Sequence, residues 1–175
     1  MAAQHAGSSG FQAQNLRLSL RPVRAQDEPF LRRVYASTRE EELARLPWGA
    51  AEKEEFLEMQ FRAQDRAYRS DYPGAELQIV LVNGEPAGRL YVWRMKKEIR
   101  IMDLALLAPF RRKGIGTRLL KEILCEGQES ARAVTIHVEV FNPAQRLYQR
   151  LGFRPVADNG VYRLMEWRAA GQSSP

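Results

Sequence analysis

Three consecutive cations followed by two glycines one residue apart form the segment of this chain that is best suited to bind an anion. In order, these residues are Arg111, Arg112, Lys113, Gly114 and Gly116. An apolar run at 101–108 precedes them and a stretch with helical periodicity follows, which predicts a buried strand, a tight turn and a helix. Free backbone N–H groups at the start of a helix, next to positive side chains, favour phosphate.

The turn does not match two common phosphate-binding loops. It lacks the glycine and lysine spacing of the P-loop and the third glycine of the Rossmann fingerprint. Alone, such a turn is more often an ordinary connection between a strand and a helix. A second patterned segment begins at Asn142, 28 positions (142 minus 114) after Gly114. Its patterned residues are Asn142, Ala144, Leu147, Tyr148, Leu151, Gly152 and Phe153.

Together, in this order and spacing, the two segments resemble those of the GNAT superfamily of acyl-CoA-dependent N-acyltransferases. The resemblance covers residues 16–167 and is most specific over 104–153. It implies an N-acetyltransferase that moves an acetyl group from acetyl-CoA to a primary amine. The alternatives are transfer of a longer acyl group and a non-catalytic module that senses acyl-CoA. Tyr148 argues against the sensor, because a binding module does not need a proton donor there.

The resemblance also implies roles for individual residues. In this family the loop holds the pyrophosphate of coenzyme A through backbone N–H groups, here those of Arg111, Arg112, Lys113, Gly114, Ile115, Gly116 and Thr117. The pantetheine arm is contacted by the strand before the loop and by the second segment, here Leu104, Ala105, Leu106, Asn142 and Ala144. The family's helix tyrosine, here Tyr148, lies beside the thioester sulfur.

The chemistry of acyl transfer agrees with these residue types. The reaction needs a neutral amine, a hydrogen-bond donor for the oxyanion and a proton for the departing thiolate. The resemblance implies that the strand before the loop separates from its parallel neighbour, which leaves backbone N–H groups unpaired, so Leu104 and Leu106 are candidate donors. A tyrosine pKa is about 10 and a thiol pKa roughly 8.5, so Tyr148 is the expected general acid. Cys125 lies far along the helix and is expected to be a packing residue, which favours direct attack in a ternary complex.

The general base and the acceptor site are less clearly marked. Asp103 interrupts an apolar strand and is the candidate base, with His137, Glu139 and the acidic run at 40–42 as alternatives. A purely structural role remains an alternative for each of them. Carboxylates suit a cationic amine and aromatic rings can flank it, so the acceptor-binding candidates are Glu41, Trp48, Tyr91 and Glu139. The acceptor could be a polyamine, an aminoglycoside, an amino acid or a protein N-terminus.

The remaining elements must position these residues. Periodicity predicts strands at 15–23, 77–82, 86–95, 99–107, 134–140, 154–158 and 161–167, and helices that begin near 27, 50, 114 and 142. Hairpins are expected at Asn83-Gly84 and Asn159-Gly160. The order β-α-α-β-β-β-α-β-α-β-β predicts an α/β (α+β) fold with a mixed, mostly antiparallel sheet of six to seven strands and helices on both faces. In it, 99–107 and 134–140 should run parallel.

Composition narrows the class of protein. The 175 residues suit one domain over 15–168, with a leader at 1–14 and a tail at 169–175. A single cysteine, with no secretory signal or membrane-spanning run, predicts a cytoplasmic protein. The net charge of +6 is spread among acidic residues, so a nucleic-acid partner is not expected. No metal site is expected, and a homodimer is possible.

Overall fold

The structure, a computed structural model, describes residues 16–171. The expected leader at 1–14 and residues 172–175 of the expected tail lie outside this range. The strands are β1 (Leu18–Pro22), β2 (Glu76–Val82), β3 (Glu85–Arg94), β4 (Glu98–Leu106), β5 (Ala133–Glu139), β6 (Arg154–Asp158) and β7 (Tyr162–Trp167). The α-helices are α1 (Glu28–Ala44), α2 (Ala50–Asp71), α3 (Ile115–Glu129) and α4 (Gln145–Arg150). None of the helices within 16–171 is long and apolar enough to cross a membrane.

The strands form one seven-stranded sheet in the order β1-β2-β3-β4-β5-β7-β6. Only β4 and β5 run parallel, and every other neighbouring pair is antiparallel. At the first expected hairpin, Asn83 and Gly84 both have positive φ, 53° and 85°, as the tightest hairpin turns require. The predicted fold class, the parallel pair and both hairpins are confirmed.

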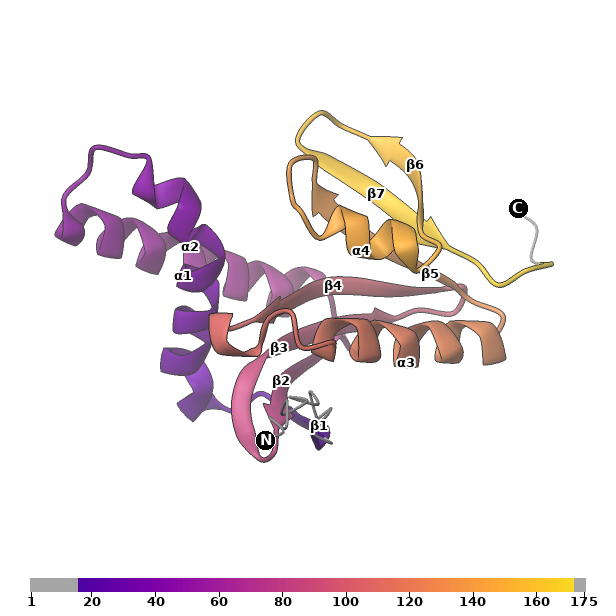
Figure 1. The fold of residues 1–175 in the computed structure, drawn as a ribbon. Helices are drawn as coiled ribbons and strands as arrows, with labels where there is room; N and C mark the ends of the chain where they lie inside the picture. Colours follow the sequence, from indigo (N-terminus) through magenta and orange to yellow (C-terminus); the bar gives the residue numbers. More distant parts are fainter. Residues whose placement is uncertain (1–15, 172–175) are drawn as a thin grey trace, which may run out of the picture.

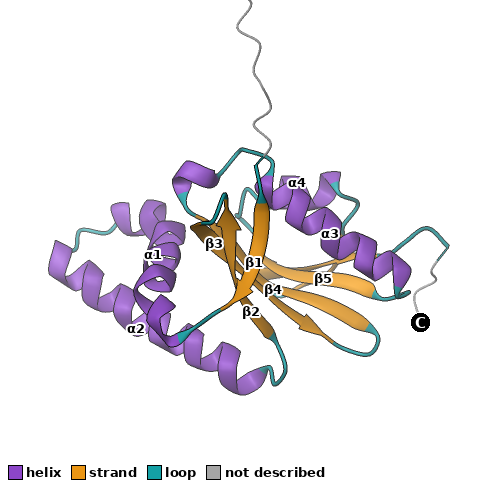
Figure 2. Cartoon of the chain, turned by 90° about the horizontal axis from the view of Figure 1, so that it is seen from below, coloured by secondary structure: helices purple, strands orange, loops and turns teal. Residues whose placement is uncertain are grey.

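The helices cover both faces of the sheet because side chains alternate along each strand (Figure 2). Leu31 and Tyr35 of α1 and Phe61 of α2 pack on Ile79 and Tyr91 at one face. On the other face, α3 and α4 pack over a larger core that holds the following buried residues: Val80, Val92, Ile101, Leu120, Val134 and Tyr148.

The inner face of α2 differs from the one that periodicity predicts. The helical spacing of Phe56, Met59, Gln60, Ala63 and Ala67 predicts that they share one face, but Met59 is 55% exposed. The residues turned to the core are Leu57, Phe61 and Tyr68. Both sets have helical spacing, so only the docking of α2 against α1 and the sheet decides between them.

The two parallel strands stay together for only part of their length. Pairing runs from Glu98 with Ala133 to Ile101 with Ile136 and then stops. From there β4 continues beside β3 alone, while β5 continues beside β7. Figure 1 shows the resulting separation between β1–β4 and the part formed by β5, β6, β7 and α4. We call residues 102–106 of β4 and 137–139 of β5 the strand divergence.

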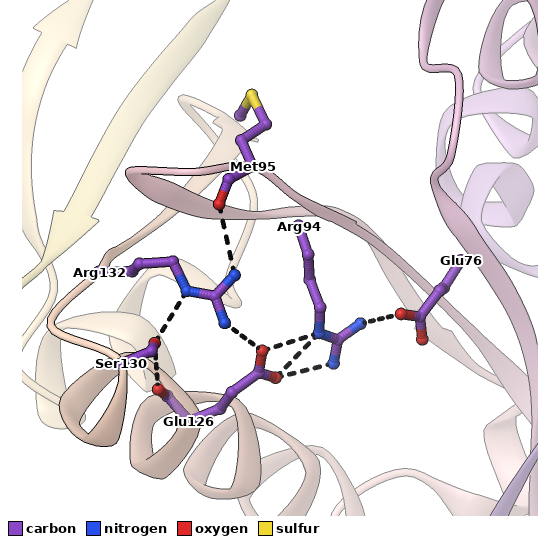
Figure 3. A network of polar contacts seen from close by, with 6 residues as sticks. All are labelled: Glu76, Arg94, Met95, Glu126, Ser130 and Arg132. Carbon is purple, nitrogen blue, oxygen red and sulfur yellow. Dashed lines mark hydrogen bonds and ion pairs between the residues drawn. The ribbon is translucent and has the colours of Figure 1, made fainter.

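An ion-pair network fixes the C-terminal half of α3 to the sheet (Figure 3). Arg94 of β3 binds Glu126 of α3 at 2.9 Å and Glu76 of β2 at 3.0 Å. Arg132 binds Glu126 at 2.7 Å and donates to the carbonyl oxygen of Met95. Burial disfavours the charge on Glu126, but the two arginines outweigh it and lower the pKa of its carboxyl. This anchoring holds α3 so that its other end meets the loop after β4.

Candidate active site

The loop between β4 and α3 exposes a run of free backbone donors. Arg112 and Gly114 have left-handed conformations, with φ of 58° and 78°, and α3 begins at the next residue, Ile115. The first backbone bond of the helix runs from Arg118 N–H to Gly114 O at 3.0 Å. Within residues 16–171, no backbone N–H from 112 to 117 donates to a backbone acceptor. These free N–H groups make the segment a candidate anion site.

Space is available in front of these donors. A Cβ atom added at Gly114 would meet no atom within 4 Å, and one added at Gly116 would meet only Leu147 Cδ2, at 4.0 Å. A shallow hollow of about 550 Å³ adjoins the loop and is lined by Gly114, Thr117, Arg118, Lys121, Glu122 and Cys125. Cys125 is exposed there, so its predicted role as a packing residue is wrong. The free donors, the room and the two cations fit a phosphate-bearing cofactor.

Arg111 differs from its neighbours because its side chain is engaged within the protein. Its Nε donates to the carbonyl oxygen of Leu106 at 2.6 Å. Its Nη2 donates to the carbonyl oxygen and to the hydroxyl of Ser37 in α1, each at 3.0 Å. The guanidinium thus fastens the loop to β4 and α1, which leaves the backbone N–H groups and the side chains of Arg112 and Lys113 for an anion.

Unpaired backbone groups of β4 face the strand divergence. Leu107 N–H donates to Ala87 O beside β3 at 2.9 Å. Because N–H directions alternate along a strand, Leu106 and Leu104 direct their N–H groups away from β3, where β5 no longer pairs. Ala105 directs its backbone toward β3, and its carbonyl oxygen lies against Gly88. Leu104 and Leu106, but not Ala105, therefore offer backbone bonds to a ligand in the strand divergence.

The helix that carries Tyr148 begins later than expected. Asn142 precedes it, and its Oδ1 accepts from Ala144 N–H at 2.9 Å, which shapes the turn into α4. The helix starts at Gln145, whose side chain donates to Glu139 O at 3.0 Å and ties α4 to the end of β5. Gly152 follows α4 in the left-handed conformation, with φ of 94°.

Tyr148 is packed but not sealed. It is 5% exposed and meets Phe153 edge to face at 5.7 Å between ring centroids. Its hydroxyl makes no hydrogen bond within residues 16–171. The oxygen is not fully buried, so it borders accessible space. Burial, with a further contribution from the charge of Asp103, raises the pKa of Tyr148. The phenol is therefore protonated at neutral pH and able to donate.

The candidate base is occupied by an ion pair. Asp103 Oδ2 contacts Nη2 of Arg89, whose side chain is only 3% exposed. The same Nη2 donates to Gln64 Oε1 of α2 at 2.8 Å. This partnership makes Asp103 part of a fixed polar cluster, so its predicted role as a free base has no support in the geometry. Sequence reasoning missed Arg89, although an arginine in the middle of an apolar strand was a usable signal.

The predicted acceptor residues do not converge on one place. Tyr91 is buried at 1% exposure beneath α2, so it is wrong as a direct acceptor contact. Glu139, at the end of β5, binds Arg39 of α1 at 3.0 Å. Trp48 packs edge-on against Phe56 at the start of α2, with ring centroids 5.3 Å apart.

Two other candidates remain open to solvent. Glu41 lies exposed on α1. His137, on β5 at the strand divergence, is exposed; partial desolvation and the nearby Arg100 lower its pKa, which favours the neutral imidazole.

A profile of the Acetyltransferase (GNAT) family matches residues 33–153, more than half of the chain. The fold and the loop thus define an acyltransferase, and the chain belongs to the GNAT acetyltransferase family. The predicted resemblance is confirmed.

Individual relatives agree with this class. The chain is 41% identical over 70 residues to N-alpha-acetyltransferase 50 of Danio rerio. The aligned segment covers 38% of this chain and 42% of that protein. It is 29% identical over 105 residues to a Bacillus subtilis protein provisionally named a ribosomal protein bS18-alanine N-acetyltransferase. That alignment covers 54% of this chain and 69% of the relative. The match thus spans less than half the length of the first relative.

Solved structures share the fold. PaiA N-acetyltransferase from Thermoplasma acidophilum, crystallised with coenzyme A, superposes with a TM-score of 0.66 at 15% identity. The superposition covers 87% of this chain and 99% of that one. This likeness supports the architecture and not a particular substrate.

Proposed function

We propose that this protein is an N-acetyltransferase that transfers the acetyl group of acetyl-CoA to a primary amine by direct attack in a ternary complex. One observation carries the proposal. Where β4 leaves β5, Leu104 and Leu106 direct N–H groups that β5 no longer pairs away from β3, and both residues pack against the core cluster that contains Tyr148. A thioester ligand that is held by its phosphates at the loop needs such donors at its acyl end.

The cofactor would be held along one continuous path. The backbone N–H groups of 112–117 would bind the pyrophosphate, with Arg112 and Lys113 adding charge. Leu104 and Leu106 would pair with the pantetheine arm, and Asn142 and Ala144 would border it at the turn into α4. Arg111 would act indirectly, by bracing the loop.

When bound, acetyl-CoA supplies the activated acyl group. The N–H of Leu104 would donate to the acyl carbonyl oxygen as negative charge develops there. Tyr148 would donate its phenolic proton toward the sulfur. Overall one C–N bond forms and the thioester C–S bond breaks; the thiolate takes the proton of Tyr148, and the proton lost by the amine nitrogen restores the phenol.

The acceptor that we favour is the α-amine of a peptide or protein N-terminus. Both sequence relatives carry names that refer to such acceptors. An α-amine has a pKa of about 8, against about 10.4 for lysine, so far more of it is neutral at pH 7. This reduces the demand on a base, which agrees with Asp103 being engaged by Arg89.

Release of free coenzyme A thiol tests the proposal. The purified protein would be given acetyl-CoA with a panel of amines: a peptide with a free N-terminal alanine, the same peptide N-acetylated, a lysine-containing peptide, a polyamine and an aminoglycoside. We expect thiol release with the free alanyl peptide and none with its acetylated control. Binding of coenzyme A without release for any amine would instead favour the acyl-CoA sensor. Faster thiol release with a longer acyl-CoA would favour transfer of a longer acyl group.

A further inference from the structure

We propose that Arg89 and Asp103 form an acceptor-positioning pair. In this pair, Arg89 holds the Asp103 carboxylate so that its second oxygen accepts a hydrogen bond from the attacking amine. Asp103 would then be a specificity-determining contact, and Arg89 a positioning residue. The inference rests on the proposed amine acetyltransfer and adds to it the group that orients the acceptor.

The pair lies where an acceptor must arrive. Asp103 directly precedes Leu104, whose N–H faces the strand divergence. The side chain of Leu104 packs with the core under α3 and α4, whereas the partner of Asp103 contacts α1 and α2. Asp103 therefore lies beside the strand divergence, on the sheet face opposite the one that α3 and α4 cover. Tyr148 belongs to the core on the other face, against which Leu104 also packs.

The carboxylate is fixed at one oxygen and available at the other. Oδ2 contacts Arg89, and Oδ1 has no hydrogen-bond partner within residues 16–171. The side chain keeps 18% of its surface exposed, so a small polar group can reach it. A neutral amine that donates one N–H to Oδ1 keeps its lone pair free for the acyl carbon beside Leu104.

Arg89 is held from several sides. Its guanidinium lies over the ring of Tyr91 on its own strand at 5.3 Å and near the ring of Tyr35 of α1 at 6.0 Å. Gln64 of α2 accepts from its Nη2 at 2.8 Å. With α1, α2 and β3 all in contact with it, Arg89 can hold Asp103 in one orientation, which positioning requires.

Stability alone does not account for this cluster. Arg89 Nε and the hydroxyl of Tyr91 are buried with no hydrogen-bond partner in the described chain. Such groups destabilise a fold, and a buried ion pair can often be exchanged for apolar side chains without loss. The cluster lacks some of its hydrogen bonds and lies next to the proposed reacting groups, so a role in function explains its presence better than stability does.

Two double variants separate positioning from structure. Arg89→Met with Asp103→Leu removes the charges together, and Arg89→Met with Asp103→Asn retains an acceptor oxygen. We expect both to keep the wild-type melting temperature to within a few degrees and the affinity for coenzyme A, measured by calorimetry, to within about twofold. With the alanyl peptide, kcat/KM should fall about 10²-fold in the Leu variant and clearly less in the Asn variant. The Asn variant discriminates against a base role, because asparagine accepts a hydrogen bond but takes no proton.

A matched control removes another ion pair that involves α2. Asp65 and Arg69 pair at 2.8 Å on an outer part of that helix. Asp65→Leu with Arg69→Met should leave kcat/KM unchanged. Wild-type kcat/KM in the Arg89 and Asp103 Leu variant would overturn the proposal, and so would equal losses in its Leu and Asn forms.

A third variant covers the case in which the doubles do not fold. Asp103→Glu keeps the charge pair and moves the carboxylate by one methylene, so peptide kcat should fall at least about tenfold while stability is retained. Unchanged kcat in a folded Asp103→Glu protein would also overturn the proposal. Failure of the proposed function has a different signature, because the wild-type protein itself would then release no thiol with any amine.

Discussion

Arg111 turns back onto the strand that precedes it, and its Nε donates to the carbonyl oxygen of Leu106 at 2.6 Å. The same guanidinium reaches Ser37 of α1. One side chain thus connects three parts of the candidate site: the end of β4, the loop between β4 and α3, and the helix on the opposite face. A residue that sequence reasoning assigns to phosphate binding is, in the fold, a brace for the loop.

Replacing Arg111 should affect both stability and cofactor binding. Arg111→Ala removes three hydrogen bonds from a charged donor at an exposed site, so we expect the free energy of unfolding to fall by about 1 kcal/mol. Affinity for coenzyme A should fall roughly tenfold, by about 1.4 kcal/mol, because the loop is no longer braced. Urea denaturation and calorimetry measure the two effects. Arg112→Ala is the control, and equal unfolding free energies for the two variants would contradict the bracing role.

Tyr148→Phe should separate chemistry from binding. Loss of the phenolic proton should lower kcat by about 10²-fold or more, as for other general acids. The ring and its contact with Phe153 are preserved, so the dissociation constant of coenzyme A should stay nearly unchanged. Steady-state kinetics and calorimetry on the same preparation provide the comparison. A parallel loss in both quantities would mean that the tyrosine serves packing.

Gly114 and Gly116 should respond differently to alanine. Gly114 has φ of 78°, so an alanine there is strained by roughly 1–2 kcal/mol although open space surrounds it. Gly116 does not have positive φ, and its added Cβ would meet only Leu147 at 4.0 Å, so Gly116→Ala should retain wild-type stability. Thermal melts of the two variants test this contrast. Equal melting temperatures would show that the loop can relax around Gly114.

Asp27 should make the fold sensitive to acid. Two hydrogen bonds from Arg21 at 2.7 Å, with one from Arg24 N–H at 2.8 Å, lower the pKa of Asp27 to about 2. A carboxyl pKa below its unfolded value of about 3.9 adds stability above that pH, and the gain disappears as pH falls through about 2. We expect Asp27→Asn to be less stable than wild type by about 2 kcal/mol at pH 7 and nearly equal to it at pH 2. Urea denaturation at both pH values measures the difference in unfolding free energy between the two proteins. A difference that does not change with pH would refute the proposed contribution of Asp27 ionisation to stability.

The sequence by itself determines the order of elements and the chemistry of the loop. Asn83-Gly84, Gly114 and Gly152 mark turns because they tolerate left-handed backbone, and Val134, Ile136 and Val138 mark a strand through simple alternation. These are local properties, carried by neighbouring residues, and they survive in the fold. The spacing between the loop and the Tyr148 segment can also be read directly from the sequence, and it identifies the family.

Only the tertiary structure decides which side chains meet across the sheet. Arg89 and Asp103 lie on different strands and become partners through the register of β3 on β4, and Arg111 finds Ser37 only when α1 is docked. The burial of Tyr91 and the inward face of α2 follow from the same docking. These contacts join residues far apart in the chain, and no periodicity encodes which distant residue will stand opposite. The loop could therefore be predicted from the sequence, whereas the acceptor side of the candidate site could not.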